Sequence, residues 1–242
     1  MRTLGCLTLI LVMVLLLAEV VLPTIFSHVV AERAPEVVRL YTGVALTPVQ
    51  SVTVRSIPAA KILFGLVDRI TIDTGPLLFA GYPVDRVRLD LREVRFVPAS
   101  LRSRGNIRII GRGDVTAAFT ITQDSLNKGL SQVGLPVASP VVTLSEGSVR
   151  IGGGVSIAGV VYNAGFVGRL ALAPSEPSKI YFIPDELDVN GQKALALLSG
   201  TMKRLIGERV LLVDLQKQGI PLVFTRVDVT RGQLTLVAAP TN

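Results

Sequence analysis

The chain has 242 residues, of which 49% are hydrophobic, and 25 basic against 18 acidic side chains give it a net charge of +7. One cysteine excludes an intramolecular disulfide, and one histidine, His28, argues against nucleophile–histidine hydrolysis and against a His/Cys zinc cluster. The lack of Trp, with few other aromatic residues, argues against base stacking on nucleic acid.

An apolar run occupies residues 3–18, and no charge interrupts it before Glu19. The run spans about 24 Å as a helix, short of a hydrocarbon core of about 30 Å, and extending it to Phe26 makes it long enough. Arg2 ahead of the run predicts a cytoplasmic start, with the rest outside. Residues 1–26 are therefore predicted to be a retained single-pass anchor in the cell membrane or a signal segment. If the segment is cleaved, the protein is secreted or periplasmic.

Residues 27–242 are predicted to form a single domain. Pro23 is predicted to open a helix that continues the anchor, and Pro35 to kink it or to start a second piece. The basic excess lies mainly in residues 32–113, and an exported basic surface favours an anionic membrane or a lipid headgroup as its partner.

Period-two alternation of apolar and polar residues predicts strands over most of this domain. It is clear in Val149–Val161 and in residues 115–121. Around Val87–Leu91 the odd positions are apolar, whereas Val94 and Phe96 are even. Such a slip predicts a bulge or bend near Arg92–Glu93 in a long, coiled strand.

Few helices are predicted among these strands. Thr122 is expected to cap a helix over 123–133, a second helix is expected over 192–206, and Arg231-Gly232 is expected to join two final strands. This order indicates an antiparallel α+β domain, in which a strongly bent sheet curls around the helices and leaves an elongated apolar seam.

Two further motifs suggest chemistry but lack its context. Gly152–Gly154 lies within a strand pattern with no helix after it, which favours a sheet bend or bulge over a phosphate loop. The acidic residues Asp185, Glu186 and Asp188 follow Pro184, which favours a solvated loop over a cation site. Nothing in the sequence indicates catalysis, a metal site or a cofactor.

The segments Ile62–Ile72, Val87–Leu91 and Ile121–Asn127, then Val189–Gly191 and the end from Gly219 to Leu236, resemble in order the LmeA-like family of bacterial exported phospholipid-binding proteins. The resemblance covers roughly residues 20–238. It implies a fold similar to tubular lipid-binding (TULIP-like) domains and phospholipid binding at the outer face of the cytoplasmic membrane, in envelope lipid or lipoglycan maintenance or transfer. The Gly152–Gly154 run and the loop between Pro136 and Pro140 depart from the family's pattern.

The resulting hypothesis is a non-enzymatic lipid-binding protein that holds acyl chains in an apolar groove. The expected lining is Leu126, Leu130, Val155, Ile157, Phe166, Leu170, Leu195, Leu198 and Met202. The expected headgroup or membrane-surface residues are Arg86, Arg88, Arg92 and Arg95. Ordinary core packing and a solvated strand face are the competing interpretations of these two sets. The alternative function is an envelope scaffold with a filled core, which binds another envelope protein and carries no lipid.

Overall fold

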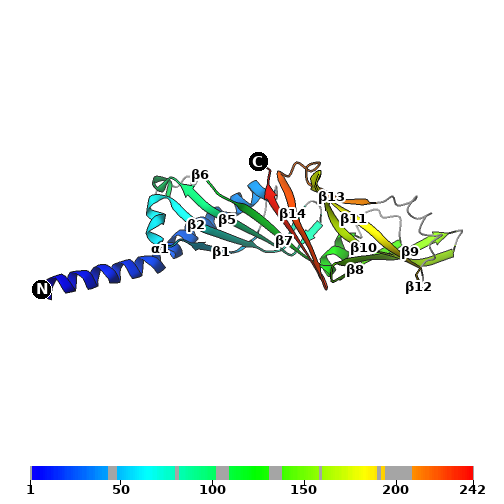
Figure 1. Ribbon diagram of the computed structural model, residues 1–242, viewed down its shortest axis with the longest axis horizontal. Helices are drawn as coiled ribbons and strands as arrows, with labels where there is room; N and C mark the ends of the chain where they lie inside the picture. Colours follow the sequence, from blue (N-terminus) through cyan, green and yellow to red (C-terminus); the bar gives the residue numbers. More distant parts are fainter. Residues whose placement is uncertain are drawn as a thin grey trace. The chain divides into compact units, whose positions relative to one another are not determined.

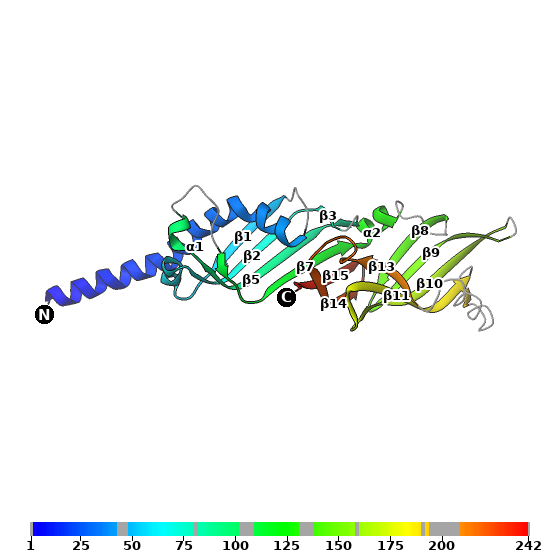
Figure 2. The same ribbon diagram turned by 90° about the horizontal axis from the view of Figure 1, so that it is seen from above.

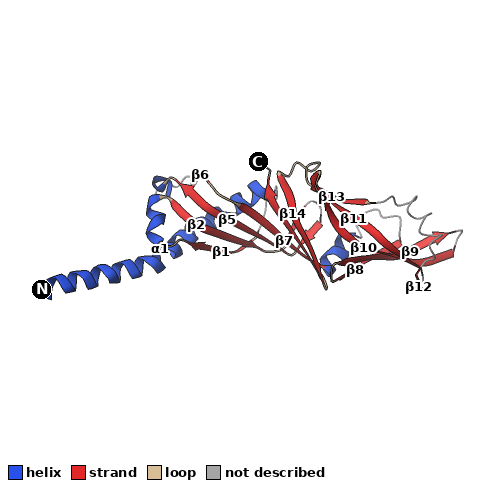
Figure 3. Ribbon diagram, viewed as in Figure 1, coloured by secondary structure: helices blue, strands red, loops and turns tan. Residues whose placement is uncertain are grey.

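The structure is a computed structural model that describes residues 2–42, 48–79, 82–101, 109–130, 138–157, 160–189, 192–193 and 209–241. The chain divides into two compact units. The N-terminal unit comprises Met1–Leu40, Ala45–Gly75 and Arg88–Thr116, and the C-terminal unit comprises Tyr41–Val44, Pro76–Val87 and Ala117–Asn242. Strands predominate over helices in the described residues (Figure 3). The predicted α+β class is consistent with this content.

A single helix, α1 (Arg2–Thr42), opens the N-terminal unit. Pro23 and Pro35 both lie inside it, so the predicted opening at Pro23 and the second piece at Pro35 are wrong. Four apolar side chains at four-residue intervals are buried, and this packing outweighs the poor helix propensity of proline. They are Phe26, Val30, Ala34 and Val38.

The prediction of an N-terminal membrane anchor is not confirmed by this helix. Among the residues that the structure describes, no helix meets the length and apolarity needed to cross a membrane.

An antiparallel sheet accompanies α1 in the N-terminal unit. Its strands are β1 (Val49–Arg55), β2 (Leu66–Thr74), β5 (Arg86–Phe96) and β6 (Ile109–Gly111). β2 pairs with β1 on one side and with β5 on the other, and β6 pairs with β5. The second half of α1 lies against one face of this sheet (Figures 1 and 2), where the rings of Phe26 and Phe96 are 4.9 Å apart.

The slip predicted in β5 is confirmed as a bend that two strands share. Two successive exposed residues occur on each strand, Asp68-Arg69 on β2 and Arg92-Glu93 on β5, while the register between the strands stays the same on both sides. Glu93 has a φ of 49°, in the left-handed region that few non-glycine residues adopt. Leu91 and Val94 are consequently both buried despite their opposite parity.

The C-terminal unit contains two larger sheets and a short hairpin. The first sheet includes β7 (Val115–Thr122), β15 (Gln233–Pro240) and β14 (Leu222–Thr230), and β15 pairs with both of the others. The second has β12 (Gln192–Lys193), β11 (Glu176–Val189), β10 (Val160–Ala173), β9 (Ser148–Ile157) and β8 (Ala138–Ser145) in that order, and β13 (Val210–Asp214) also pairs with β11. The hairpin joins β3 (Leu77–Phe79) to β4 (Tyr82–Val84).

The predicted turn at Arg231-Gly232 is confirmed, and the irregularity predicted at Gly152–Gly154 is displaced. Thr230 pairs with Gln233, and Gly232 has a φ of 74°, so Arg231-Gly232 is the tight turn that was expected. β8 shifts register between Ala138 and Val141, opposite Gly154 and Gly152, so the irregularity expected at the glycine run lies in the neighbouring strand.

Three predictions about strands and helices need correction. The pattern over Val149–Val161 belongs to two strands, because Ile157 pairs with Val160 and the chain reverses between them. The acidic residues Asp185, Glu186 and Asp188 lie within strand β11 rather than in a loop. Gln192–Lys193 is a strand, and the remainder of the helix predicted over 192–206 lies outside the described residues.

Candidate functional site

A cavity of about 360 Å³ lies in the N-terminal unit between α1 and the sheet. Pockets for small ligands usually measure about 300–1,000 Å³, so this volume is large enough for part of a ligand molecule. The cavity is lined by Phe26, Val30, Arg33, Glu36, Val37 and Arg39 of α1, Ile70 and Ile72 of β2, Leu91, Val94 and Phe96 of β5, and Ile109 of β6.

The floor of this cavity is apolar because of the paired bend in β2 and β5. Leu91 and Val94 would lie on opposite faces of a regular strand, but both line the cavity. Ile70, the first residue after the bend in β2, adds a third aliphatic side chain. A local irregularity that the sequence revealed therefore widens the apolar surface of the site.

Charged side chains from α1 complete the lining. Arg33 is half-buried, whereas Glu36 and Arg39 are exposed, so the cavity reaches solvent along this stretch of the helix. Two guanidinium groups and one carboxylate then border an aliphatic interior. Guanidinium groups bind phosphate through several N–H donors in a fixed plane. The arrangement suits a ligand with a long apolar part and an anionic end.

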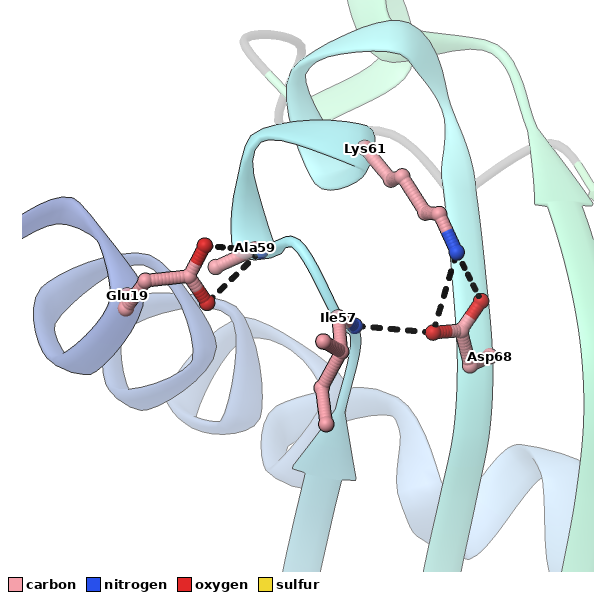
Figure 4. A network of polar contacts seen from close by, with 5 residues as sticks. All are labelled: Glu19, Ile57, Ala59, Lys61 and Asp68. Atoms are coloured by element: carbon pink, nitrogen blue, oxygen red, sulfur yellow. Dashed lines mark hydrogen bonds and ion pairs between the residues drawn. The ribbon is translucent and has the colours of Figure 1, made fainter. Parts of the chain in front are cut away.

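A set of hydrogen bonds fixes α1 to the chain that follows β1 (Figure 4). The amide of Ala59 donates to both carboxylate oxygens of Glu19 at 2.9 Å. The amide of Ile57 donates to Asp68 at 2.8 Å, and the ammonium group of Lys61 donates to the same carboxylate at 3.0 Å. The bond from Ile57 and then that from Lys61 lower the pKa of Asp68 below its ordinary value.

A second, smaller cavity of about 90 Å³ lies in the C-terminal unit. It is lined by apolar side chains of both larger sheets and by Tyr82 and Leu126. Burial raises the pKa of Tyr82, whose hydroxyl donates to the carbonyl of Leu212. This volume is about a quarter of that of the larger cavity.

The helix α2 (Gln123–Leu130) connects to the edge of β8 through side chains. Asn127 accepts from the amide of Val142 at 2.6 Å and donates to the carbonyl of the same residue at 3.1 Å, as a neighbouring strand would. Gln123 accepts from the amide of Leu144 at 2.8 Å. Thr122 Oγ1 accepts from the amide of Ser125, which confirms the predicted helix cap.

Comparison with family models matches residues 18–239 to one family, which is described as LmeA-like phospholipid-binding. The chain belongs to this family. The resemblance inferred from the sequence is thereby confirmed over nearly the whole chain. No curated protein and no solved structure matches the chain.

The predicted lipid-lining residues of this LmeA-like protein are only partly placed. Leu126 and Leu170 lie in the lining of the smaller cavity, and Phe166 is half-buried on β10. The side chains of Leu130, Val155 and Ile157, and all of Leu195, Leu198 and Met202, lie outside the described residues. The lipid-lining role of this set stays a prediction.

The larger cavity was missed because its residues looked like the end of an anchor and an ordinary strand pair. Two signals point to it in retrospect. One is the four-residue spacing of Phe26, Val30 and Ala34, which continues beyond the apolar run. The other is the change of the apolar residues from odd to even positions after Leu91, because a regular strand that packs on a helix keeps them at positions of one parity.

The four arginines expected to face headgroups all lie exposed on β5. Arg88 forms an ion pair with Asp73 at 2.9 Å, which raises the pKa of the guanidinium. The side chain of Arg95 lies over Gly111 of β6. Arg86 and Arg92 are exposed on the same strand, and the membrane-facing role of the four arginines stays a prediction.

No three His, Cys, Asp or Glu side chains gather as metal ligands would in the part of the chain that the structure describes. Asp185, from the acidic set in β11, instead lies 3.6 Å from Arg169 on the paired strand β10.

Proposed function

We propose that this protein binds one phospholipid in the cavity of its N-terminal unit and acts as a non-enzymatic carrier or holder of lipid. The acyl chain occupies the space between α1 and the sheet. The phosphate lies at the rim, beside Arg33 and Arg39. The protein works at the outer face of the cytoplasmic membrane, in envelope lipid or lipoglycan maintenance or transfer.

The observation that carries this proposal is an apolar cavity of about 360 Å³ with arginines at its opening, in a chain of a phospholipid-binding family. Each methylene group removed from water contributes about 0.8 kcal/mol. A partly enclosed chain of several carbons therefore provides useful affinity without a specific polar site. The rim arginines add electrostatic attraction for an anionic headgroup.

The test is native mass spectrometry of the full chain after release from detergent micelles, with extraction and identification of the bound lipid. Wild type is expected to retain phospholipid in near-stoichiometric amount. Val37→Trp places a bulky ring in the larger cavity, and we expect it to lose most of that lipid.

The matched control is Leu126→Trp, which places the same ring in the smaller cavity. We expect this variant to keep its lipid, because the smaller cavity lies outside the proposed binding site. A wild-type chain without lipid, which also takes up none from vesicles, would favour the scaffold hypothesis. Equal loss in both variants, with circular dichroism showing intact folding, would rule out the larger cavity as the site.

A further inference from the structure

An exposed apolar segment lies beside the N-terminal half of α1. It consists of residues 57–66, between β1 and β2, and includes the short 3₁₀ helix η1 (Ala59–Phe64); we call it the apolar tip. Ile57 is 79% exposed, Phe64 77% and Leu63 61%. Single exposed apolar residues are common on protein surfaces, but three large ones within eight residues mark an interaction site.

Buried side chains and hydrogen bonds hold the apolar tip in place. Ala59 and Ile62 are buried, so η1 is pinned through one face while Leu63 and Phe64 project from the other. Gly65 ends η1 with a φ of 77°, and a Cβ there would lie 2.1 Å from the carbonyl oxygen of Phe96. The amides of Ile57 and Ala59 donate hydrogen bonds to Asp68 and Glu19, and these bonds fix the start of the segment (Figure 4). Exposure of Leu63 and Phe64 is therefore a fixed feature of the fold.

A row of arginines crosses the sheet next to the apolar tip. Arg55 pairs in register with Arg69, and Arg69 with Arg92, so the three lie side by side on the exposed face. Arg69 binds Asp90, whereas among the described residues neither Arg55 nor Arg92 has an acidic partner. Like charges directly opposite each other destabilise a sheet unless an anion lies between them.

The apolar surface continues onto α1. Leu16, Leu17 and Val20 are exposed on the helix around Glu19, the residue whose carboxylate binds Ala59 of the apolar tip. Aliphatic side chains of the helix and of the apolar tip thus belong to the same end of the N-terminal unit. Together with the arginine row, they present apolar and positively charged side chains on one surface. An anionic bilayer attracts such a surface through its acyl chains and its phosphates.

We propose that the apolar tip docks on an anionic phospholipid bilayer, with Leu63 and Phe64 at the acyl boundary and with Arg55 and Arg92 at lipid phosphates. The inference deepens the proposed function, on which it rests for its lipid context. It names the surface by which the cavity-bearing unit meets the membrane.

The experiment uses the full chain with Cys6→Ser, so that one new cysteine carries an environment-sensitive NBD probe. Phe64→Cys places the probe on the apolar tip, and Leu78→Cys places it at an exposed leucine of the C-terminal unit as the matched control. Both proteins are reconstituted into vesicles of phosphatidylglycerol and phosphatidylcholine that contain nitroxide-labelled lipid. We expect blue-shifted emission and several-fold stronger quenching at position 64 than at position 78.

The arginines are tested by Arg55→Gln combined with Arg92→Gln. We expect quenching at position 64 to fall in this background, and to fall in all proteins when phosphatidylglycerol is omitted or salt is raised. Equal quenching at both probe positions overturns the proposal. Blue-shifted emission at position 64 without quenching by the bilayer places the apolar tip against a second copy or another protein, and also overturns it.

Bound lipid is measured by mass spectrometry on the same samples. A quenched probe at position 64 in a protein without cavity lipid supports the docking surface and refutes the proposed function. A lipid-loaded protein whose probe at position 64 is not quenched supports the proposed function and refutes the docking surface.

Discussion

The two cavities of this protein are enclosed by different kinds of packing. In the N-terminal unit a helix covers a sheet and leaves about 360 Å³, whereas in the C-terminal unit side chains of two sheets meet and leave about 90 Å³. Facing sheets interdigitate over their whole inner surfaces. A single helix contacts a sheet along one stripe, so space remains beside it. The helix-covered unit is therefore the better place for a lipid chain.

The largest expected effect concerns the aromatic contacts of the two units. Phe26 packs on Phe96 beside the larger cavity, and Phe119 stacks on Phe79 with ring centres 4.2 Å apart in the C-terminal unit. Phe26→Ala and Phe119→Ala should each lower the free energy of unfolding by about 3–5 kcal/mol. A short-chain phosphatidylglycerol should restore stability to Phe26→Ala alone, since ligand binding stabilises only the unit that holds the site.

Hydrogen exchange read separately in β2 and β10 measures this difference. Phe26→Leu is the control, because it keeps most of the buried volume and should lose far less stability. Equal rescue of both alanine variants by lipid would mean that the two cavities do not differ in ligand binding.

The next effect concerns Asn127, which completes the edge of β8. Asn127→Ala leaves the buried amide and carbonyl of Val142 without partners, and we expect a loss of about 2–4 kcal/mol in the C-terminal unit. Urea unfolding followed by circular dichroism measures it. Gln216→Ala, in an exposed turn, should change stability very little. Retained lipid in Asn127→Ala would agree with a site in the other unit, and loss of lipid would contradict it.

The sequence predicted the strands better than the site. Alternation in residues 115–121 identified β7, and the turn at Arg231-Gly232 and the cap at Thr122 were both confirmed. These features depend on local chemistry: side-chain period, a positive φ at glycine, and a hydroxyl that accepts an amide proton. The division into β9 and β10 was not predicted, because the apolar pattern continues from one strand into the next.

The larger cavity depends on contacts that no local pattern encodes. Its walls combine Val30 and Val37 of α1 with Leu91 of β5, more than fifty residues later in the chain. Each side chain alone is that of an ordinary core residue. The lining predicted from the sequence therefore lies on segments with clear amphipathic patterns instead, and of its residues Leu126 and Leu170 line the smaller cavity. The motif Ile121–Asn127, the most specific part of the resemblance, joins α2 to β8 through Gln123 and Asn127.

A smaller, pH-dependent effect is expected at Asp85 of the C-terminal unit. Burial opposes its ionisation, but bonds from the amide of Thr122 and the hydroxyl of Ser125 hold the pKa of this carboxyl below its ordinary value of 3.8. A lowered pKa stabilises the fold above pH 3.8, and this contribution disappears as the pH falls through the folded-state value.

Asp85→Asn should therefore lower the free energy of unfolding by about 1 kcal/mol at pH 7. Its stability should converge with that of wild type below pH 3.8. Urea titrations from neutral to acidic pH measure both values. If the difference in unfolding free energy between Asp85→Asn and wild type stays constant down to the lowest pH, the charge of Asp85 does not stabilise the fold as assigned.

The smallest effect on stability separates two arginines of the same strand. Arg88 is paired with Asp73 at the surface, and exposed pairs contribute about 0.2–1 kcal/mol, whereas Arg92 belongs to the row beside the apolar tip. Arg88→Gln and Arg92→Gln should both change stability by less than about 1 kcal/mol. Only Arg92→Gln should reduce quenching of the probe at position 64 by phosphatidylglycerol vesicles. If Arg88→Gln reduces quenching equally, the whole exposed face of β5 attracts the membrane. That result would contradict a specific role for the arginine row that contains Arg92.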